Sequence, residues 1–597
     1  MSARAARAWL ISIGLLALAL RLVGIGYGLP AIYNMDEVAI MNRALAFATG
    51  DLNPHNFLYP TLYFYVLFAW EGLVFLLGWA FGVFDSLTAF QREFFVDPSR
   101  LYLVGRGLTV LCGVLTVTAL YRLGSRVFGR TAGVLSALFL ATAPFAVRDA
   151  HYIKHDVPVT FLVVLTHVAL AGLVVVPERR RLRRAWAGVG VLAGLAISTH
   201  YYAVFLVLPV AAVALMPAAG TPDPIGLRLR NLTTAGLFAI TAFLLASPFL
   251  LPEAATAWRD IVQNREIVMD RAVASGGLFA SLGRYLEMLW SEAIGWPVAA
   301  FGAGGLALVS LSDRRRAVLL ALYPVTFLVF IGNTVPAGRY LNPVLPFVAL
   351  AAAYTVVRLA GGVATGIAWA RTRPEPIAAI VGLAAAWPGA LVSYGTSTFF
   401  TATDTRTLAQ AFIEREIPAG SSVLVQPYSV ALRQSREGLV EALRATRGSE
   451  ESASTKFRLL LDLNPYPAPA YRTIYLGIGG LDADKIYVSP RVFDDQVGLE
   501  PLRRIGVEYV VIKRFPDADP SFAGLDRGLA REGRLLATFS PYRDDAAPAA
   551  RASVQPFLHN TDARLDGALG RPGPTIEVWR VLPGSGDPRT TMAKGQG

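Results

Sequence analysis

The sequence predicts a polytopic α-helical membrane protein with about eleven transmembrane helices, followed by an extracytoplasmic α/β domain. Three observations support this fold class. Hydrophobic residues make up 54% of the 597 residues and charged residues only 16%, whereas soluble domains carry about 25% charge. Apolar segments approaching the ~20 residues of a spanning helix recur as far as residue 397. From residue 398 onward, polar residues increase and short β-rich segments appear.

Net charge and cysteine content narrow the functional classes. The formal charge is +12, but surplus Lys and Arg in a membrane protein hold cytoplasmic loops in place, so we expect no nucleic-acid partner. Cys112 is the only cysteine, which excludes a disulfide framework and a zinc site of the Cys-x-x-Cys type. No Ala-x-Ala cleavage site follows the first apolar segment, so we predict a retained helix and not a signal peptide.

The transmembrane prediction is based on a series of apolar segments. The segment 185–216 is too long for one span and is interrupted by polar residues around His200, so we predict a hairpin of two short helices with His200 at its outer tip. The other predicted spans are 8–27, 103–121, 131–147, 157–176, 233–250, 297–311, 317–331, 343–357 and 377–397.

Basic clusters between these segments set the predicted topology. All of them face the cytoplasm if an even number of crossings separates neighbouring clusters, which places the N-terminus inside and the C-terminus outside. Counting 58–82 as a crossing breaks this pattern, and this segment carries Pro60 and Glu71. We therefore predict that 58–82 is interfacial or re-entrant within the first outer loop, 28–102; the alternative is a true span that breaches the charge rule. The clusters are Arg4 and Arg7; Arg122, Arg126 and Arg130; Arg179 to Arg181 with Arg183 and Arg184; Arg228 and Arg230; Arg314 to Arg316; and Arg371 with Arg373.

The predicted domains are therefore a membrane domain, 1–397, and an extracytoplasmic α/β domain, 398–597. An amphipathic helix over Thr405–Glu416 opens the second domain, and the proline and glycine that follow it stop the helix. Residues 541–572 and the tail after Pro583 are expected to be loosely ordered. The predicted strands are Ser422–Gln426, Thr473–Ile478, Glu508–Lys513 and Thr575–Val581.

Ionisable residues at the outer ends of the spans are the candidates for chemistry, because burying them near lipid is costly. Asp36 and Glu37 follow the first span. Two adjacent carboxylates at a membrane surface suit a general base with its supporting acceptor, or a pair of metal ligands. The alternative is a helix N-cap at Asp36.

The second outer loop is dense in ionisable groups. His151 and His155 lie four residues apart, as metal-ligand pairs do, but no third His is near. An oxygen-ligated Mg²⁺, Mn²⁺ or Ca²⁺ at Asp149 or Asp156 is a possible cofactor. The alternative is a solvated turn in which Asp156 caps the next helix. The ionisable residues of this loop are Arg148, Asp149, His151, Lys154, His155 and Asp156.

A third constellation, Arg339 with Tyr340, lies at the outer end of the ninth predicted span. Guanidinium pairs bidentately with phosphate oxygens, so this Arg suits a phosphate or diphosphate that arrives from the lipid. The alternative is an interfacial anchor. His55 with Tyr59, and His200, complete a polar ring on the same membrane face.

Five sequence motifs occur in an order that resembles a known protein family. They are Asp36-Glu37; Tyr59-Pro60-Thr61-Leu62-Tyr63-Phe64-Tyr65; His155-Asp156-Val157-Pro158; Gly194 to Tyr201; and Arg339-Tyr340-Leu341-x-Pro343-Val344-Leu345-Pro346. Together they resemble the GT-C superfamily of membrane glycosyltransferases, in the branch of protein O-mannosyltransferases and lipid A aminoarabinose transferases. Tyr59 and His200 stand where that branch usually has Lys.

This resemblance implies a hexosyl- or pentosyltransferase in the cell membrane. Its donor would be a sugar on a polyprenyl phosphate, and its acceptor a glycan, lipid or protein at the outer face. The family pattern implies Asp36 as the general base, Glu37 as its positioning partner and Asp156 as a second acidic group. Arg339, with Lys154 or Arg148, would stabilise the leaving phosphate.

A transporter or lipid-linked sugar flippase is the alternative from another functional class, with the same ionisable residues lining a path. Two observations argue against it. The polar clusters gather at one membrane face instead of the midplane, and no repeat relates the two halves of the chain.

Overall fold

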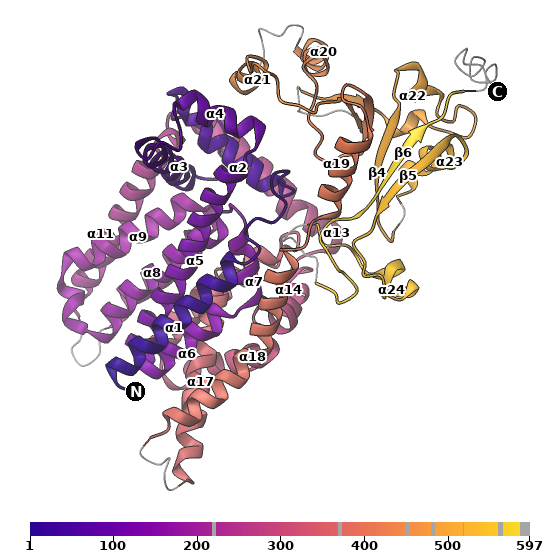
Figure 1. The fold of residues 1–597 in the computed structure, drawn as a ribbon. Helices are drawn as coiled ribbons and strands as arrows, with labels where there is room; N and C mark the ends of the chain where they lie inside the picture. The colour runs from indigo at the N-terminus through magenta and orange to yellow at the C-terminus, as the bar shows by residue number, and fades with distance from the viewer. Residues whose placement is uncertain are drawn as a thin grey trace, which may run out of the picture.

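The computed structural model describes residues 1–217, 223–367, 373–447, 454–478, 484–517, 519–558 and 565–584. Figure 1 shows a helical bundle, coloured indigo to salmon, beside an orange and yellow region that contains a β-sheet. The tail after Pro583, predicted to be loosely ordered, lies almost wholly outside the described residues. The bundle helices are α1 (Ala3–Leu22), α2 (Met35–Ala46), α3 (Leu62–Ala80), α4 (Leu87–Val96), α5 (Ser99–Phe128), α6 (Arg130–Ala141), α7 (Pro144–Arg148), α8 (Asp156–Val175), α9 (Arg183–Thr199), α10 (Val207–Leu215), α11 (Ile225–Ala246), α12 (Ala254–Arg265), α13 (Arg271–Gly276), α14 (Leu282–Met288), α15 (Trp296–Ser312), α16 (Arg314–Ile331), α17 (Leu345–Thr365) and α18 (Glu375–Phe399).

Within the described residues, seven helices are long and apolar enough to cross a membrane: α1, α3, α5, α8, α11, α17 and α18. The pair α6 and α7, bent by 62°, gives an eighth if it forms one span. This is fewer than the eleven crossings predicted. The difference arises because the segments 185–216, 297–311 and 317–331 form helices that are short or begin with arginines.

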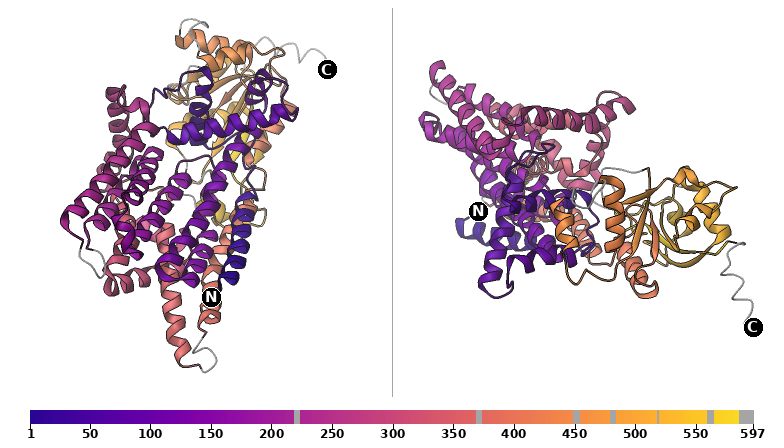
Figure 2. Two further views of the ribbon diagram at one scale, coloured as in Figure 1. Left: turned by 90° about the vertical axis from the view of Figure 1, so that its left-hand side faces the viewer. Right: turned by 90° about the horizontal axis from the view of Figure 1, so that it is seen from above.

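Helix α3 coincides with the segment predicted to be interfacial, although its length and composition would allow a span. Figure 1 views α3 nearly along its axis, whereas α5 and α17 run across the same view, and the side view in Figure 2 agrees. Helix α3 therefore lies crosswise to the long helices; its interfacial position stays a prediction.

The basic clusters gather at one end of the bundle. Contacts join segments from different clusters there, at the end where the N-terminus lies in Figure 1, opposite the β-sheet region. This common placement is what the parity of the charge pattern predicts. The contacts are Arg230 Nη2 to the Arg181 carbonyl (3.0 Å), Arg315 Nη2 to the Pro217 carbonyl (3.1 Å) and the Met1 amine to Glu375 (2.7 Å), and Arg126 Nη1 and Arg179 Nη1 both lie beside Gly172 of α8.

The segment 185–216 forms the predicted hairpin. Arg180, just before α9, donates to the carbonyl of Met216, just after α10, at 2.7 Å. The start of α9 and the end of α10 therefore lie at the same end of the bundle. His200 lies at the turn between the two helices, as predicted, and lines a pocket with Asp36 there.

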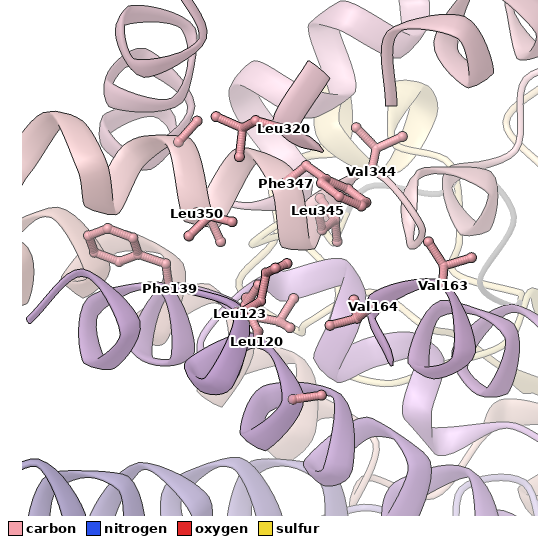
Figure 3. Packing of buried hydrophobic residues seen from close by; sticks show 14 of the residues in the cluster. Leu120, Leu123, Phe139, Val163, Val164, Leu320, Val344, Leu345, Phe347 and Leu350 are labelled. Carbon is pink, nitrogen blue, oxygen red and sulfur yellow. The ribbon is translucent and has the colours of Figure 1, made fainter. Parts of the chain in front are cut away.

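The largest apolar cluster lies in the bundle, and smaller clusters lie around α2, α3 and α4. Figure 3 shows part of the largest cluster, where Leu120 and Leu123 of α5 face Phe347 and Leu350 of α17. Lipid tails are as apolar as Leu, so association of these helices depends on close van der Waals packing. Small residues provide that packing between α9 and α11.

The region after α18 is an open α/β sheet. The strand order is β3-β2-β1-β4-β6-β5; β1 pairs in parallel with β2 and β4, β2 with β3, and β6 is antiparallel to its neighbours. All four predicted strands are present, and the predicted amphipathic helix has the predicted bounds. Strands β3 and β5 were not predicted. The elements are α19 (Thr405–Glu416), β1 (Ser422–Val425), α20 (Arg436–Arg447), α21 (Thr455–Leu461), β2 (Arg472–Leu476), β3 (Ile486–Val488), α22 (Glu500–Arg504), β4 (Tyr509–Arg514), α23 (Ala523–Glu532), β5 (Gly533–Phe539), α24 (Pro548–Ser553) and β6 (Thr575–Val581).

The junction between the sheet region and the bundle centres on Arg406. Its guanidinium is buried, pairs with Asp404 at 2.7 Å and lies 3.8 Å from the Tyr33 ring centroid. Phe557 packs beside it against Tyr27. The expectation that all of 541–572 is loosely ordered is therefore wrong for its described residues, because an aromatic side chain from this segment completes the junction.

The packing between α9 and α11 leads to a first testable prediction. A Cβ at Gly194 would collide with the Ala239 carbonyl oxygen of α11. We expect Gly194→Val to force the helices apart and cost about 1–3 kcal/mol of stability, measured as a lower thermal unfolding temperature in nanodiscs. Gly188→Val in the same helix is the control, because Gly188 has open space around its Cβ position. Equal unfolding temperatures for the two variants would contradict this account of the packing.

Candidate functional site

One face of helix α2 lines a pocket. The N-cap of α2 is Asn34, whose side chain accepts a hydrogen bond from the Asp36 backbone N–H at 3.1 Å. Asp36, Ala39, Ile40 and Arg43 all line the pocket. Their spacing is that of a single helical face, so Asp36 and Arg43 stand about two turns apart, or ~10 Å along the helix axis.

Asp36 pairs with Lys154. The Lys154 Nζ lies 2.8 Å from Asp36 Oδ2; the lysine side chain is 3% exposed and the aspartate 47% exposed. Burial, followed by the charge of Arg339, lowers the pKa of Lys154, and the Asp36 carboxylate opposes this shift. The carboxylate thus remains accessible while its cationic partner is enclosed.

The rest of the pocket comes from loops and helix ends. Asp156 begins α8 and accepts a hydrogen bond from the Tyr202 hydroxyl at 3.2 Å. Three cations and two carboxylates line the pocket, which leaves it one net positive charge when the histidines are neutral. The lining residues outside α2 are Tyr59, Lys154, His155, Asp156, His200 and Arg339.

An aromatic wall faces these charges. The rings of Tyr59 and His155 stack at 4.4 Å, and the His200 ring meets Tyr59 edge-on at 5.2 Å. Burial lowers the pKa of His155 to about 3 and also lowers the pKa of His200. Both imidazoles are therefore neutral at physiological pH, and they offer a packing surface and hydrogen bonds instead of positive charge.

Arg339 lies on the short 3₁₀ helix η8 (Gly338–Leu341), which a buried network holds in place. Asn342 donates from Nδ2 both to Asp149 Oδ2 at 2.6 Å and to the Arg339 carbonyl at 3.0 Å. Arg148 donates to the other Asp149 oxygen at 3.0 Å. Tyr340 follows Arg339, whose guanidinium lies 5.0 Å from the Tyr340 ring centroid.

Glu37 faces away from the pocket. Arg106 of α5 donates to both of its carboxylate oxygens, at 2.9 and 2.8 Å, and both side chains are buried. The backbone N–H of Ile153 donates to Glu37 Oε1 at 2.9 Å. Glu37 therefore fixes α2 against α5 and against the loop that carries Lys154.

Two of the predicted site histidines also lie elsewhere. His151 is buried and bonds the carbonyls of Val147 and Val23, so its environment is structural. His55 is exposed and bridges Asp51 and Glu253, at 2.8 and 2.9 Å, which ties the loop before α3 to the loop before α12.

The structure thus brings together Asp36, Tyr59, Lys154, His155, Asp156, His200 and Arg339 from the predicted set. Glu37, His55, Arg148, Asp149, His151 and Tyr340 are outside the pocket lining. Arg43 lines the pocket and was not predicted; its signal in the sequence is its place seven residues after Asp36, on the same helical face.

The residues present do not fit the predicted divalent cation. Both oxygens of Asp149 are occupied, by Arg148 and by Asn342, and the side chain is buried. Asp156 shares its pocket with three cations. No group of three metal-ligand side chains occurs among the described residues. We therefore derive no catalytic step through a metal.

Comparisons with known proteins place the fold. Residues 102–251 match the family model described as dolichyl-phosphate-mannose-protein mannosyltransferase. No curated protein matches the chain. Among solved structures, the chain is similar to ArnT from Cupriavidus metallidurans bound to undecaprenyl phosphate, with 13% identity, 97% of this chain and 98% of that chain covered, and a TM-score of 0.53.

It is also similar to the archaeal oligosaccharyltransferase AglB from Archaeoglobus fulgidus in complex with an inhibitory peptide and a dolichol-phosphate. Here the identity is 11%, the coverage 96% of this chain and 88% of that chain, and the TM-score 0.51. At these identities the shared feature is the fold. Together with the family-model match, it confirms the predicted resemblance to GT-C membrane glycosyltransferases.

The buried ion pair between Glu37 and Arg106 leads to a second testable prediction. Glu37→Gln leaves the Arg106 charge buried without its counter-ion, and we expect a loss of about 3–5 kcal/mol in stability, measured by thermal unfolding in nanodiscs. Glu93→Gln is the matched control, because Glu93 pairs with Arg100 at 3.3 Å across a half-exposed surface, where a pair contributes about 0–1 kcal/mol. If both variants unfold at the wild-type temperature, the buried pair does not fix α2.

Proposed function

We propose that this chain transfers a sugar from a polyprenyl-phosphate donor to an acceptor glycan, lipid or protein at the extracytoplasmic face of the cell membrane. One observation carries the proposal: a half-exposed carboxylate, Asp36, opens onto a pocket with a surplus of cationic groups. A base beside an anion-binding surface is what transfer from a lipid phosphate requires.

The proposed reaction is a single displacement. Asp36 removes the proton from an acceptor hydroxyl, and the acceptor oxygen forms a bond to the anomeric carbon of the sugar. The bond between that carbon and the phosphate oxygen breaks, and its electron pair leaves with the lipid phosphate. Attack opposite to the leaving group inverts the anomeric centre.

Each pocket residue has a proposed part in this reaction. Arg339 binds the phosphate and stabilises the charge that develops on it as the bond breaks. Lys154 holds the Asp36 carboxylate in position through their ion pair at 2.8 Å. Arg43 adds a further cation, and within the described ranges no hydrogen bond or ion pair joins it to another residue. Asp156 orients the sugar by accepting hydrogen bonds from the sugar hydroxyls.

The wall of Tyr59, His155 and His200 is the proposed sugar platform. A sugar ring presents a flat apolar face that packs on aromatic rings. The His155 Nε2 is buried and has no hydrogen-bond partner among the described residues. A buried polar atom without a partner is costly, so a sugar hydroxyl bound there would satisfy it.

The proposed orientation follows from the charge distribution. The basic clusters lie at the bundle end that carries the N-terminus, which we place in the cytoplasm. The pocket and the sheet region then lie outside. In this arrangement residues 1–397 form the membrane domain that contains the catalytic site, and residues 398–597 form the extracytoplasmic α/β domain.

The third prediction tests the base. With radiolabelled polyprenyl-phosphate sugars and protein in nanodiscs, we expect Asp36→Asn to lower the rate of lipid phosphate release at least about 100-fold, because the amide cannot accept the acceptor's proton. Asp85→Asn is the control: it removes the same charge from an exposed position in the same outer loop.

Full turnover by Asp36→Asn would refute the role of the base. If the wild type releases no lipid phosphate but moves lipid or sugar across sealed vesicles, the transporter alternative replaces transfer.

The fourth prediction tests the orientation. In a Cys112→Ser background, we expect Ala419→Cys, in the loop between α19 and β1, to react with a membrane-impermeant maleimide on intact cells. Ser312→Cys, beside Arg314 to Arg316, should react only after permeabilisation. The reverse pattern would contradict the proposed topology.

A further inference from the structure

The sheet region contains a topological switch point. From β1 the chain passes to β2 and then β3 on one side, and returns to β4 on the other side of β1. In open α/β sheets, ligands bind in the crevice at the carboxyl ends of the parallel strands where the strand order reverses. The carboxyl ends of β1 and β4 meet here: the Gln426 N–H donates to the Val511 carbonyl, and Gln426 Oε1 accepts from the Lys513 N–H at 2.8 Å.

Tyr428, just after β1, has an unusual backbone. Its φ is +66°, in the left-handed region that bulky residues avoid at a cost of about 1–3 kcal/mol. Its side chain is nonetheless 57% exposed, so burial of the ring does not offset this cost. Strained residues of this kind cluster at ligand-binding sites, where function keeps them.

Lys513, at the end of β4, lies beside that ring. Its Nζ is 5.3 Å from the Tyr428 ring centroid and 5.7 Å from the Phe515 centroid. Within the described residues, the ammonium forms no hydrogen bond or ion pair. Burial, and next the charge of Arg406, lower the pKa of Lys513. A half-buried ammonium between two aromatic rings, with no anion beside it, is a cation available to a ligand.

The carboxyl end of β4 lies near the junction with the bundle. Lys513 is close enough to Arg406 to feel its charge, and Arg406 stacks on the Tyr33 ring at 3.8 Å. Tyr33 precedes Asp36 by three residues, and its hydroxyl is 2.8 Å from Thr407 of α19. The junction therefore connects the switch point to the start of α2, the helix that carries Asp36.

We propose that Tyr428 and Lys513 form a binding site for an anionic carbohydrate, which serves as the acceptor of the sugar. This inference rests on the proposed function. The exposed Tyr428 ring packs against the apolar face of the sugar ring, and the Lys513 ammonium pairs with a phosphate or carboxylate on the same molecule. The sheet region thereby selects acceptors by charge and presents them toward Asp36.

Binding of a small probe tests the site directly. The probe is glucose 6-phosphate, measured by saturation-transfer NMR on the full chain in nanodiscs, with glucose and inorganic phosphate as reference probes. We expect glucose 6-phosphate to bind more tightly than either reference probe. Tyr428→Gly and Lys513→Met should each weaken its binding at least ten-fold, whereas Tyr428→Phe should retain it, because the ring remains.

Two features of this variant set exclude a trivial loss of fold. Glycine adopts positive φ freely, so Tyr428→Gly should unfold at or above the wild-type temperature. Lys485→Met is the matched control, since Lys485 lies 5.1 Å from the Tyr475 ring centroid in the same sheet, away from the switch point. Wild-type binding by both Tyr428→Gly and Lys513→Met, or equal binding of glucose and glucose 6-phosphate, would overturn the proposal.

A kinetic measurement separates this proposal from the proposed function. Once an anionic acceptor supports turnover, Tyr428→Gly should raise its KM and leave kcat within two-fold. If Asp36-dependent transfer occurs but neither KM nor probe binding changes in the variants, the acceptor site is wrong and the transferase stands. If the probe binds as expected but no donor is turned over, the transferase is wrong; Tyr428 and Lys513 then form a carbohydrate site without the acceptor role.

Discussion

The ion pair between Glu37 and Arg106 is the constraint on which the site depends. Glu37 is the neighbour of Asp36, and the Ile153 N–H that it accepts belongs to the neighbour of Lys154. One buried carboxylate therefore fixes the backbone on both sides of the Asp36–Lys154 pair. Burying two charges is favourable only where the geometry satisfies both of them. The bidentate Arg106 guanidinium and the Ile153 N–H provide that geometry for Glu37. The neighbouring carboxylate, Asp36, can therefore be exposed and still keep its position.

Much of the fold could be predicted from the sequence because the bilayer imposes length and apolarity on spanning helices. The helix over Thr405–Glu416 was predicted to the residue from its amphipathic pattern and from Pro418 and Gly420 after it, and the structure adds Asp404 as its N-cap. Strand β3 was missed because it has only three residues, too few for a pattern. Strand β5 was missed because its residues are half-buried or exposed, so no buried face appears in its sequence.

The site was harder to predict than the fold because neighbours in sequence face different ways. His151 and His155 are four residues apart, yet one bonds backbone carbonyls inside the bundle and the other lines the pocket. A break between the short helix η2 (Asp149–His151) and α8 separates them, which a helical spacing rule does not anticipate. Asn342 carried no signal, because its role depends on Asp149 from a distant segment. Burial also determines which side chains are charged. His155 and His200 are neutral because they are buried, so the positive charge of the pocket comes from Arg and Lys.

The junction at Arg406 has a consequence for how the protein is made. Tyr27 and Arg406 both donate to the carbonyl of Leu558, at 3.0 and 3.3 Å, and Thr405 donates to that of Pro574 at 2.6 Å. The carbonyl that Tyr27 binds thus belongs to a residue 531 positions later in the chain, which is synthesised long after Tyr27. During translation, the Tyr27 and Thr405 hydroxyls lack these protein partners until Leu558 and Pro574 have been synthesised. The junction between the bundle and the sheet region can therefore be completed only after the segment with Leu558 and Pro574 has been synthesised, and a chain truncated before this segment leaves polar groups of the junction without these partners.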